Sequence, residues 1–234
     1  MVAAGSSSRM DGVDKIFAPL AGRPLICHAV DALERFSPVG TVVLVLSAAN
    51  LDRGVSLARD EGWTKATVVP GGGRRQESVR AGLDALPETD WTIVHDGARP
   101  CLTRVTLETG LSEARRTGAA IAAVPVTDTV KAVDGDLIVT ATPARSALWA
   151  VHTPQVFSTE LLRRAHDRID HDVTDDASMV EQIGGSVRVF MDSYANIKIT
   201  TPEDLAHAEV LIMSGALRVG TSGVPPASGM GGTA

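Results

Sequence analysis

The chain has few aromatic residues and few cysteines, and each shortage excludes a class of protein. Of its 234 residues, 3% are aromatic and two are cysteines, Cys27 and Cys101. So few aromatic side chains cannot form a stacking platform for nucleic acid. The two cysteines are far apart and form no C-x-x-C pair, which argues against a zinc site and a disulfide framework. A reducing cytoplasm is therefore the expected location.

Net positive charge and long apolar runs are also missing. The formal net charge is -6, so no global field attracts nucleic acid or an anionic membrane, and an anionic ligand must be held locally. No basic and apolar leader opens the sequence and no apolar run reaches about 18 residues, so we expect neither secretion nor a membrane span. Lysine is scarce as well, with only Lys15, Lys65, Lys131 and Lys198 among 22 basic residues. Each lysine is therefore a candidate for chemistry.

Short apolar runs alternate with helical patterns along most of the chain. This alternation is typical of βα units and predicts an α/β fold, with a Rossmann-like, mainly parallel sheet flanked by helices, in one domain over residues 1–213. Strands are expected at 2–3, 41–47, 66–69, 91–95, 119–124 and 187–191. Helices are expected at 24–35, 51–61, 76–86, 103–117, 158–169, 175–183 and 202–213.

Three segments depart from this regular pattern. In residues 127–142, Asp134-Gly135 between two apolar stretches predicts an inserted β-hairpin, and such an arm often reaches a partner subunit. Residues 214–234 are rich in Gly, Ser and Pro and predict a disordered tail. The first strand is short, and if it lies inside the sheet a few more residues before it are expected.

The first candidate binding segment joins the opening strand to a small, polar loop. It runs from Val2 to Met10, contains Arg9 and is followed by Lys15. Small residues allow backbone amides to approach phosphate oxygens, and the two cations can neutralise them. The segment lacks the G-x-x-x-x-G-K-[ST] and G-x-G-x-x-G patterns. Taken alone, a solvated turn with stray charges explains it as well as a phosphate site does.

Two further loops follow predicted strands. Residues 71–79 contain three glycines and open a helix, and ligands of open α/β sheets bind beyond the carboxyl ends of strands. The strand at 91–95 ends in His95-Asp96, where the carboxylate could organise a metal-bound triphosphate or a substrate hydroxyl. A flexible turn and a helix-capping aspartate are the structural alternatives. His95 has no metal-ligand spacing and is expected to be structural.

Seven motifs occur in a fixed order along the chain. They are A-A-G-x-x-x-R-M, G-G-x-x-R-x-x-S-V, H-D-x-A-R-P, D-T-V-K, T-P-Q-x-F, T-D-D-A-S and N-I-K-I-T-T-P-E-D-L. Together they resemble the 2-C-methyl-D-erythritol 4-phosphate cytidylyltransferase family of the non-mevalonate isoprenoid pathway, over about residues 2–213. The resemblance implies a nucleotidyltransferase fold and the transfer of CMP from CTP to a small polyol phosphate, with Mg²⁺ bound mainly through the CTP phosphates.

The resemblance also implies roles for individual residues. The catalytic group would be Arg9, Lys15, Arg145 and Lys198, and no residue is assigned as a metal ligand. The substrate-binding group would be Ala3, Ala4, Gly5, Gly72, Gly73, Arg75, Ser78, Asp96, Gly97, Arg99, Thr129, Thr153 and Thr174. The alanine and glycine loops would hold CTP, whereas the later residues would surround the acceptor. Thr129 and Arg145 would come from the neighbouring subunit, so a homodimer is implied.

Two positions differ from the family pattern, and three rival functions stay open. Gly73 stands where the family often has Asp, and Asp14 stands where a Pro usually precedes the lysine. The nearest rival is a ribitol 5-phosphate cytidylyltransferase. The second rival is a nicotinamide-dependent dehydrogenase, although this sequence lacks the full glycine fingerprint of that class. The third is a non-catalytic sugar-nucleotide-binding module. No G-x-S-x-G nucleophile motif is present, which agrees with direct transfer to the acceptor's phosphate.

Overall fold

A computed structural model describes residues 1–5, 14–215 and 217. Arg9 lies outside the described residues, as does most of the segment 214–234, so the predictions made for them stay untested. Among the residues that are described, no helix combines the length and the apolar character needed to cross a membrane.

The centre of the molecule is a sheet built from two hydrogen-bonded groups of strands. The first group has the order β1 (Val2–Ala3), β4 (Val42–Leu46) and β5 (Ala66–Pro70), all parallel. The second has the order β11 (Arg188–Met191), β7 (Ala119–Pro125), β10 (Trp149–Ser158) and β6 (Trp91–Val94). A parallel bridge from Val2 to Asp96 joins the groups, so β1 lies between β4 and the end of β6.

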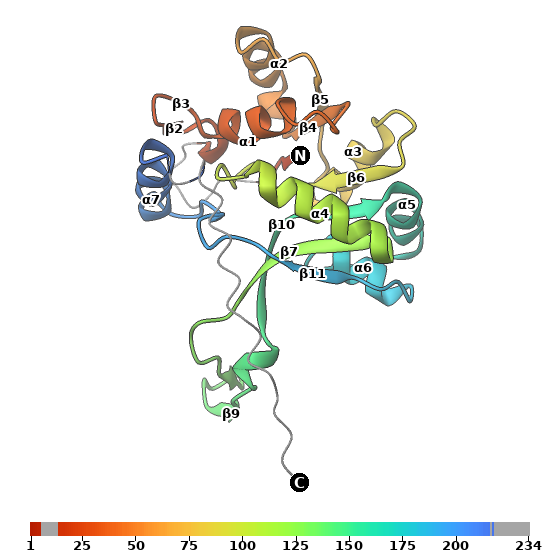
Figure 1. Ribbon diagram of the computed structural model, residues 1–234, viewed down its shortest axis with the longest axis vertical. Helices are drawn as coiled ribbons and strands as arrows, with labels where there is room; N and C mark the ends of the chain where they lie inside the picture. The colour runs from red at the N-terminus through yellow and green to blue at the C-terminus, as the bar shows by residue number, and fades with distance from the viewer. Residues whose placement is uncertain (6–13, 216, 218–234) are drawn as a thin grey trace.

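Helices cover both faces of this sheet (Figure 1). The apolar residues of α3 (Arg75–Asp84), α5 (Thr159–Arg168) and α6 (Asp176–Gln182) form one buried cluster against the sheet. On the other face, α1 (Leu25–Glu34), α2 (Leu51–Asp60) and α4 (Arg104–Thr117) pack with the sheet in separate clusters. The last helix, α7 (Pro202–Met213), packs near β2 (Pro19–Leu20), which pairs with β3 (Arg23–Pro24).

The predicted strands and helices are present within a few residues of their expected bounds, and the mainly parallel α/β fold is confirmed. The short pair β2 and β3 was not expected, and neither was the long strand β10. β10 runs antiparallel to both β6 and β7, which makes the sheet mixed at this point. Its sequence contains Pro154, which lacks the N–H that a ladder needs and normally argues against a strand. The pairing with β7 shifts between Val151 and Gln155, so the proline lies where the ladder is interrupted.

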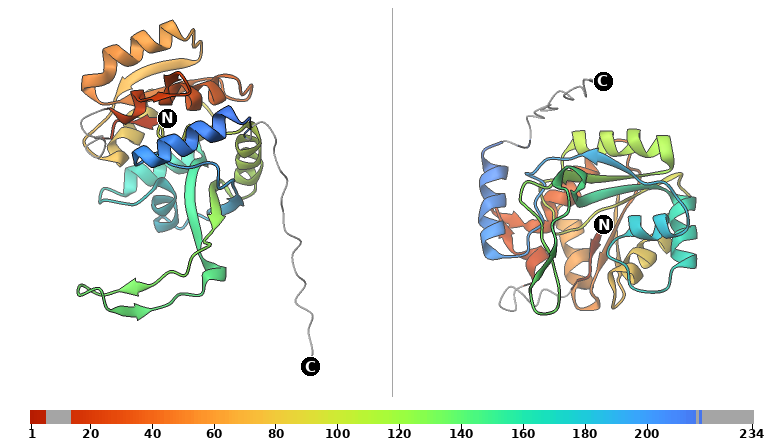
Figure 2. Two further views of the ribbon diagram at one scale, coloured as in Figure 1. Left: turned by 90° about the vertical axis from the view of Figure 1, so that its left-hand side faces the viewer. Right: turned by 90° about the horizontal axis from the view of Figure 1, so that it is seen from below.

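The inserted hairpin is also confirmed, as β8 (Ala132–Val133) paired with β9 (Val139–Ala141). Its turn is longer than the Asp-Gly pair suggested. The side chain of Asp134 accepts hydrogen bonds from the N–H groups of Asp136 and Ile138, and Leu137 takes the left-handed conformation with φ 64°. Figure 2 shows the arm extending away from the body of the molecule.

Candidate active site

Three predicted loops meet at the carboxyl ends of β1, β5 and β6. A Cβ atom added to Gly71 would lie 2.5 Å from the Cβ of Ala4 and 2.7 Å from the Oγ of Ser78. A Cβ added to Gly97 would lie 2.8 Å from the Cβ of Ala3. Because real side chains do not approach this closely, these glycines are what allow the loops to touch.

The start of α3 faces this meeting point. Glu77 Oε2 accepts from the backbone N–H of Arg74 at 3.1 Å, and a Cβ on Gly72 would lie 2.3 Å from the Cβ of Glu77. Gly72 therefore leaves room for the helix cap. A Cβ on Gly73 would only make ordinary contact with Glu77 Oε2 at 3.7 Å, and one on Gly5 would meet nothing within 4 Å. Since a helix N-terminus attracts negative charge, this loop can hold phosphate groups.

Asp96 is the centre of a cluster of charged side chains. Its Oδ2 lies 2.8 Å from the Nζ of Lys198, and its Oδ1 lies 3.7 Å from Nη2 of Arg75. Burial by itself would raise the pKa of Asp96, but the positive charges of Lys198 and Arg75 outweigh it and hold the pKa below its usual range. The carboxylate is therefore ionised between two cations and is not a helix cap.

A hydrogen-bond chain fixes the backbone on which Asp96 stands. The N–H of Asp96 donates to Oγ1 of Thr153 at 3.0 Å, and the Thr153 hydroxyl lies 3.1 Å from Nδ1 of His95. Nε2 of His95 lies 3.1 Å from the carbonyl oxygen of Arg99. A carbonyl only accepts, so Nε2 carries the proton and Nδ1 accepts from Thr153. This chain joins β6 to the interrupted part of β10 and confirms a structural position for His95.

His95 gives the fold a specific dependence on pH. The ring is fully buried, and burial lowers its pKa from 6.5 to about 4. The unfolded chain therefore binds a proton between pH 6.5 and 4 that the folded chain rejects, so stability falls as the pH falls through this window.

We predict that the free energy of unfolding drops by about 3 kcal/mol through His95 between pH 7.5 and pH 4, because one unit of pKa difference is worth about 1.4 kcal/mol. Chemical denaturation of the wild type and of His95→Gln gives the free energy of unfolding of each protein at each pH in this range. The contribution of His95 is the difference between the two slopes of this free energy against pH. Equal slopes for the two proteins would contradict the low pKa of His95.

The segment that carries Lys198 is held against β10 by Asn196. Its Nδ2 donates to the carbonyl oxygen of Thr153 at 2.8 Å and to Oδ2 of Asp192 at 2.7 Å. Nη1 of the buried Arg99 donates to the carbonyl oxygen of Asn196 at 2.6 Å. Asn196 therefore positions Lys198 beside Asp96. The N-I-K motif contained this residue, but only the fold shows what its side chain contacts.

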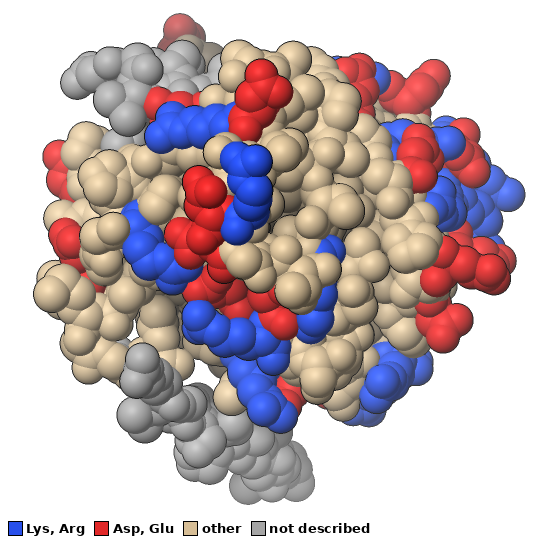
Figure 3. Space-filling view, turned by 90° about the horizontal axis from the view of Figure 1, so that it is seen from above, with Lys and Arg blue, Asp and Glu red and all other residues tan. Residues whose placement is uncertain are grey.

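A cavity of about 460 Å³ lies over this cluster. Six of the predicted site residues line it, namely the substrate-binding Arg75, Asp96, Arg99, Thr153 and Thr174 and the catalytic Lys198. Its acidic and basic groups are mixed, as they are on the face of the molecule shown in Figure 3. A small ligand carrying both phosphate and hydroxyl groups suits such a lining, because cations pair with the phosphate and Asp96 accepts from a hydroxyl.

The remaining predicted residues lie elsewhere. Lys15 begins the short helix η1 (Lys15–Phe17), whose Ile16 and Phe17 pack in one cluster with Ala3 of β1. Thr129 and Arg145 belong to the exposed arm region and do not line the cavity of their own chain. Nη1 of Arg145 donates to the carbonyl oxygen of Thr127 at 2.6 Å.

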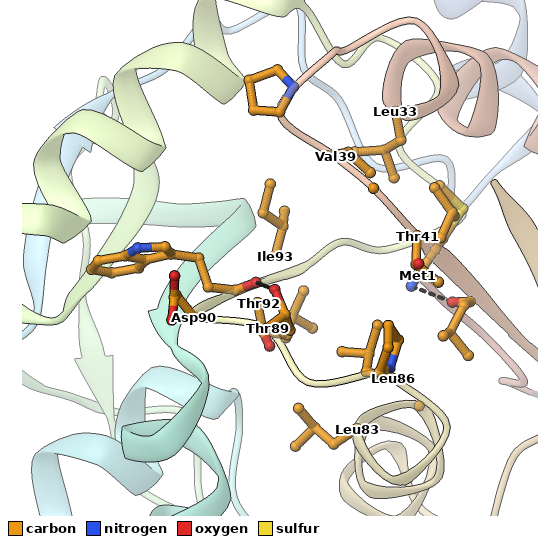
Figure 4. A pocket seen from close by; sticks show the side chains of 18 of the residues that line it. Met1, Leu33, Val39, Thr41, Leu83, Leu86, Thr89, Asp90, Thr92 and Ile93 are labelled. Atoms are coloured by element: carbon orange, nitrogen blue, oxygen red, sulfur yellow. Dashed lines mark hydrogen bonds between the residues drawn. The ribbon is translucent and has the colours of Figure 1, made fainter.

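A second cavity, of about 340 Å³, lies at the opposite ends of the strands (Figure 4). It is bounded by Met1, Thr41 and Trp91 at the amino ends of β1, β4 and β6, and by Leu83 and Leu86 of the α3 region. Its walls are mostly apolar, and Arg115 is the one Lys or Arg among the described residues that line it. A ligand with several phosphates would lose hydration there and gain few charged partners, so the cavity beside Asp96 is the better candidate for the active site.

The 2-C-methyl-D-erythritol 4-phosphate cytidylyltransferase family model matches residues 1–214. The chain belongs to this family. A cytidylyltransferase of this name from Dehalococcoides mccartyi is 43% identical over 216 residues, which cover 92% of this chain and 95% of the relative. One from Prochlorococcus marinus is 46% identical, over 91% of this chain and 96% of the relative.

Solved cytidylyltransferase structures share the fold. The 4-diphosphocytidyl-2C-methyl-D-erythritol synthase of Anaerococcus prevotii superposes with a TM-score of 0.80 at 28% identity, over 91% of this chain and 95% of the other. The family assignment makes the chain a nucleotidyltransferase and not a dehydrogenase. The relatives are named for methylerythritol phosphate, so the ribitol alternative is not favoured.

Proposed function

We propose that this cytidylyltransferase transfers CMP from CTP to 2-C-methyl-D-erythritol 4-phosphate and releases pyrophosphate. The observation that carries the proposal is the cavity in which Arg75, Asp96 and Lys198 meet beyond the carboxyl ends of the strands. The glycine loop and the start of α3 would hold the CTP phosphates. The cavity would hold the acceptor, with Lys198 and Arg75 near its charged groups and Asp96 near a hydroxyl.

The reaction asks little of the protein in proton transfer. An oxygen of the acceptor's phosphate attacks the α-phosphorus of CTP, a new phosphorus–oxygen bond forms, and the bond to the β-phosphate breaks with its electrons leaving on pyrophosphate. The attacking oxygen is already anionic, so positioning and charge neutralisation supply the catalysis. The site is consistent with a reaction that needs no general base, because both ring nitrogens of His95 are hydrogen-bonded and burial lowers its pKa to about 4.

Mg²⁺ is proposed as the cofactor. In the described part of the chain, no group of three or more His, Cys, Asp or Glu side chains is arranged to hold a metal ion, and Asp96 is paired with Lys198. These residues suit an ion carried mainly by the CTP phosphate oxygens. When bound, the ion would neutralise phosphate charge, and the chain's own cations would orient the same phosphates.

A homodimer is proposed to complete the site. The arm exposes Val133, Leu137, Ile138 and Val139, between 48% and 78% of each being accessible. Apolar groups exposed together on an arm favour burial against a partner. Docking on a second copy would bring Thr129 and Arg145 to the partner's cavity. The two free, buried cysteines suit the proposed reducing cytoplasm.

A pyrophosphate-release assay tests the proposed activity. Purified protein is incubated with Mg²⁺, each of the four nucleoside triphosphates, and either methylerythritol 4-phosphate or ribitol 5-phosphate. We expect turnover with CTP and methylerythritol 4-phosphate, and loss of that turnover with excess chelator. Faster turnover with ribitol 5-phosphate would overturn the acceptor assignment, and absence of release in every mixture would overturn the proposed activity.

A further inference from the structure

Asp176 is a buried carboxylate just outside the cavity. It is the first residue of α6 and its side chain is 1% exposed. An ion buried this deeply is costly unless every oxygen has a partner. Here both do, since Oδ2 lies 2.7 Å from Nη1 of Arg75 and Oδ1 lies 3.2 Å from Nε2 of His166. Asp176 does not line the cavity, so it would act on a ligand only through a neighbour.

The neighbour through which it acts is Arg75. The guanidinium lines the cavity, and its Nη2 faces Asp96 at 3.7 Å while Nη1 stays on Asp176. A guanidinium is planar, so fixing one nitrogen determines where the others point. With Asp176 in place, Arg75 stays between two carboxylates. Without its charge, Asp96 becomes the stronger partner and would draw the guanidinium away from its present position.

His166 supports the same arrangement from α5. Its side chain is 1% exposed, and its Nε2 donates to the Asp176 oxygen that Arg75 does not use. Burial would raise the pKa of Asp176, but the hydrogen bond from His166 and the charge of Arg75 outweigh it and lower the pKa. Side chains from two helices, Arg75 of α3 and His166 of α5, therefore converge on the ionised carboxylate of α6.

We infer that Asp176 is a positioning residue for nucleotidyl transfer, which holds the Arg75 guanidinium in the orientation that meets phosphate in the cavity. The inference rests on the proposed function, because it takes the ligand of Arg75 to be a phosphate group of CTP or of the acceptor. It assigns no contact between Asp176 and substrate.

The test is a double-mutant cycle with Asp176→Asn and Arg75→Ala. Asparagine keeps the shape but removes the charge, and we expect kcat/KM to fall about 20-fold, the scale of a lost charge-assisted hydrogen bond. In the Arg75→Ala background the same substitution should cost less than about twofold, because the group on which it acts is gone. Equal losses in both backgrounds would overturn the inference, since a purely structural role is independent of Arg75.

The chain offers a matched control. Arg80 of α3 and Asp167 of α5 form an ion pair at 2.6 Å that joins two of these helices, but both side chains are exposed and neither lines the cavity. Asp167→Asn should leave kcat/KM within about twofold of the wild type. A loss as large as that of Asp176→Asn would show that any ion pair linking these helices matters, and would overturn the inference.

Stability and activity are read separately. If Asp176→Asn does not fold in thermal denaturation, Asp176→Glu, which keeps the charge but displaces it, takes its place in the cycle. Wild-type turnover with CTP and methylerythritol 4-phosphate is measured first, and its absence counts against the proposed function alone. With turnover established, the cycle reports on the positioning role.

Arg75→Lys should lose as much kcat/KM as Asp176→Asn, because an ammonium group cannot span both carboxylates. Full activity of Arg75→Lys would contradict the positioning role of Asp176.

Discussion

Lys15→Ala is expected to lower kcat by at least about 100-fold, the scale of losing one preorganised group that stabilises transition-state charge. η1 packs against Ala3 of β1, so the backbone of Lys15 is held beside the strand that leads into the proposed CTP-binding loop. Its charge would stabilise the pyrophosphate as the bond to the α-phosphorus breaks. Because this demand is greatest in the transition state, kcat should fall more than the KM for CTP rises.

Lys65→Ala is the matched control for this prediction. Lys65 directly precedes β5, so it lies at the opposite end of this strand from the glycine loop that begins at Gly71. Its Nζ donates to the carbonyl oxygen of Phe36 at 3.1 Å. Its loss should leave kcat within about twofold, since Lys65 is partly buried against Phe36 and does not line the cavity beside Asp96. Steady-state pyrophosphate release measures both variants. Near-normal kcat in Lys15→Ala would refute the role of this lysine.

Lys198→Ala should raise the KM for methylerythritol 4-phosphate by at least about 30-fold, while the KM for CTP changes by less than about threefold. The Nζ of Lys198 lies 2.8 Å from Asp96, and the side chain is 44% exposed toward the cavity. In the proposed site, its removal would cost the acceptor a phosphate partner, and it leaves Asp96 with the more distant Arg75. Hydrogen bonds to charged groups are worth about 1.5–3 kcal/mol, which sets this scale.

The same variant should also change the pH profile. Lys198 is the strongest of the cations that lower the pKa of Asp96, so removing it raises that pKa. Asp96 then takes up a proton at a higher pH, and the acid side of the kcat/KM profile for the acceptor moves upward. Lys198→Arg, which keeps the charge, should leave the acid side near its wild-type position. Unchanged acceptor kinetics in Lys198→Ala would remove Lys198 from the acceptor site.

Much of the fold followed from local sequence patterns. Apolar runs such as 42–46 and 119–124 form buried strands, and the helices between them begin near the expected residues. β10 could not be found in this way, because Pro154 breaks the strand signal and the ladder is interrupted beside it. That interruption is part of the candidate site, since it is where Thr153 contacts His95 and Asp96.

The site was predictable in part. Asp96 and Lys198 are about a hundred residues apart, and only the family resemblance placed them together before the fold was known. The rule that ligands bind beyond the carboxyl ends of parallel strands predicted where the proposed CTP-binding loops lie. The supporting contacts of Asn196, His166 and Asp176 could not be derived, because buried hydrogen bonds depend on how helices pack and leave no local pattern. Thr129 and Arg145 stay predictions, since they await a partner subunit.

The central claim is that the cavity beside Asp96 receives the acceptor while the glycine loop holds the nucleotide. A crystal structure with the product, 4-diphosphocytidyl-2-C-methyl-D-erythritol, tests it most directly. We expect the cytidine along residues 71–78 and the methylerythritol group within hydrogen-bonding distance of Asp96 and Lys198. Product bound in the apolar cavity beside Met1 and Trp91, with the Asp96 cavity left without it, would contradict the account.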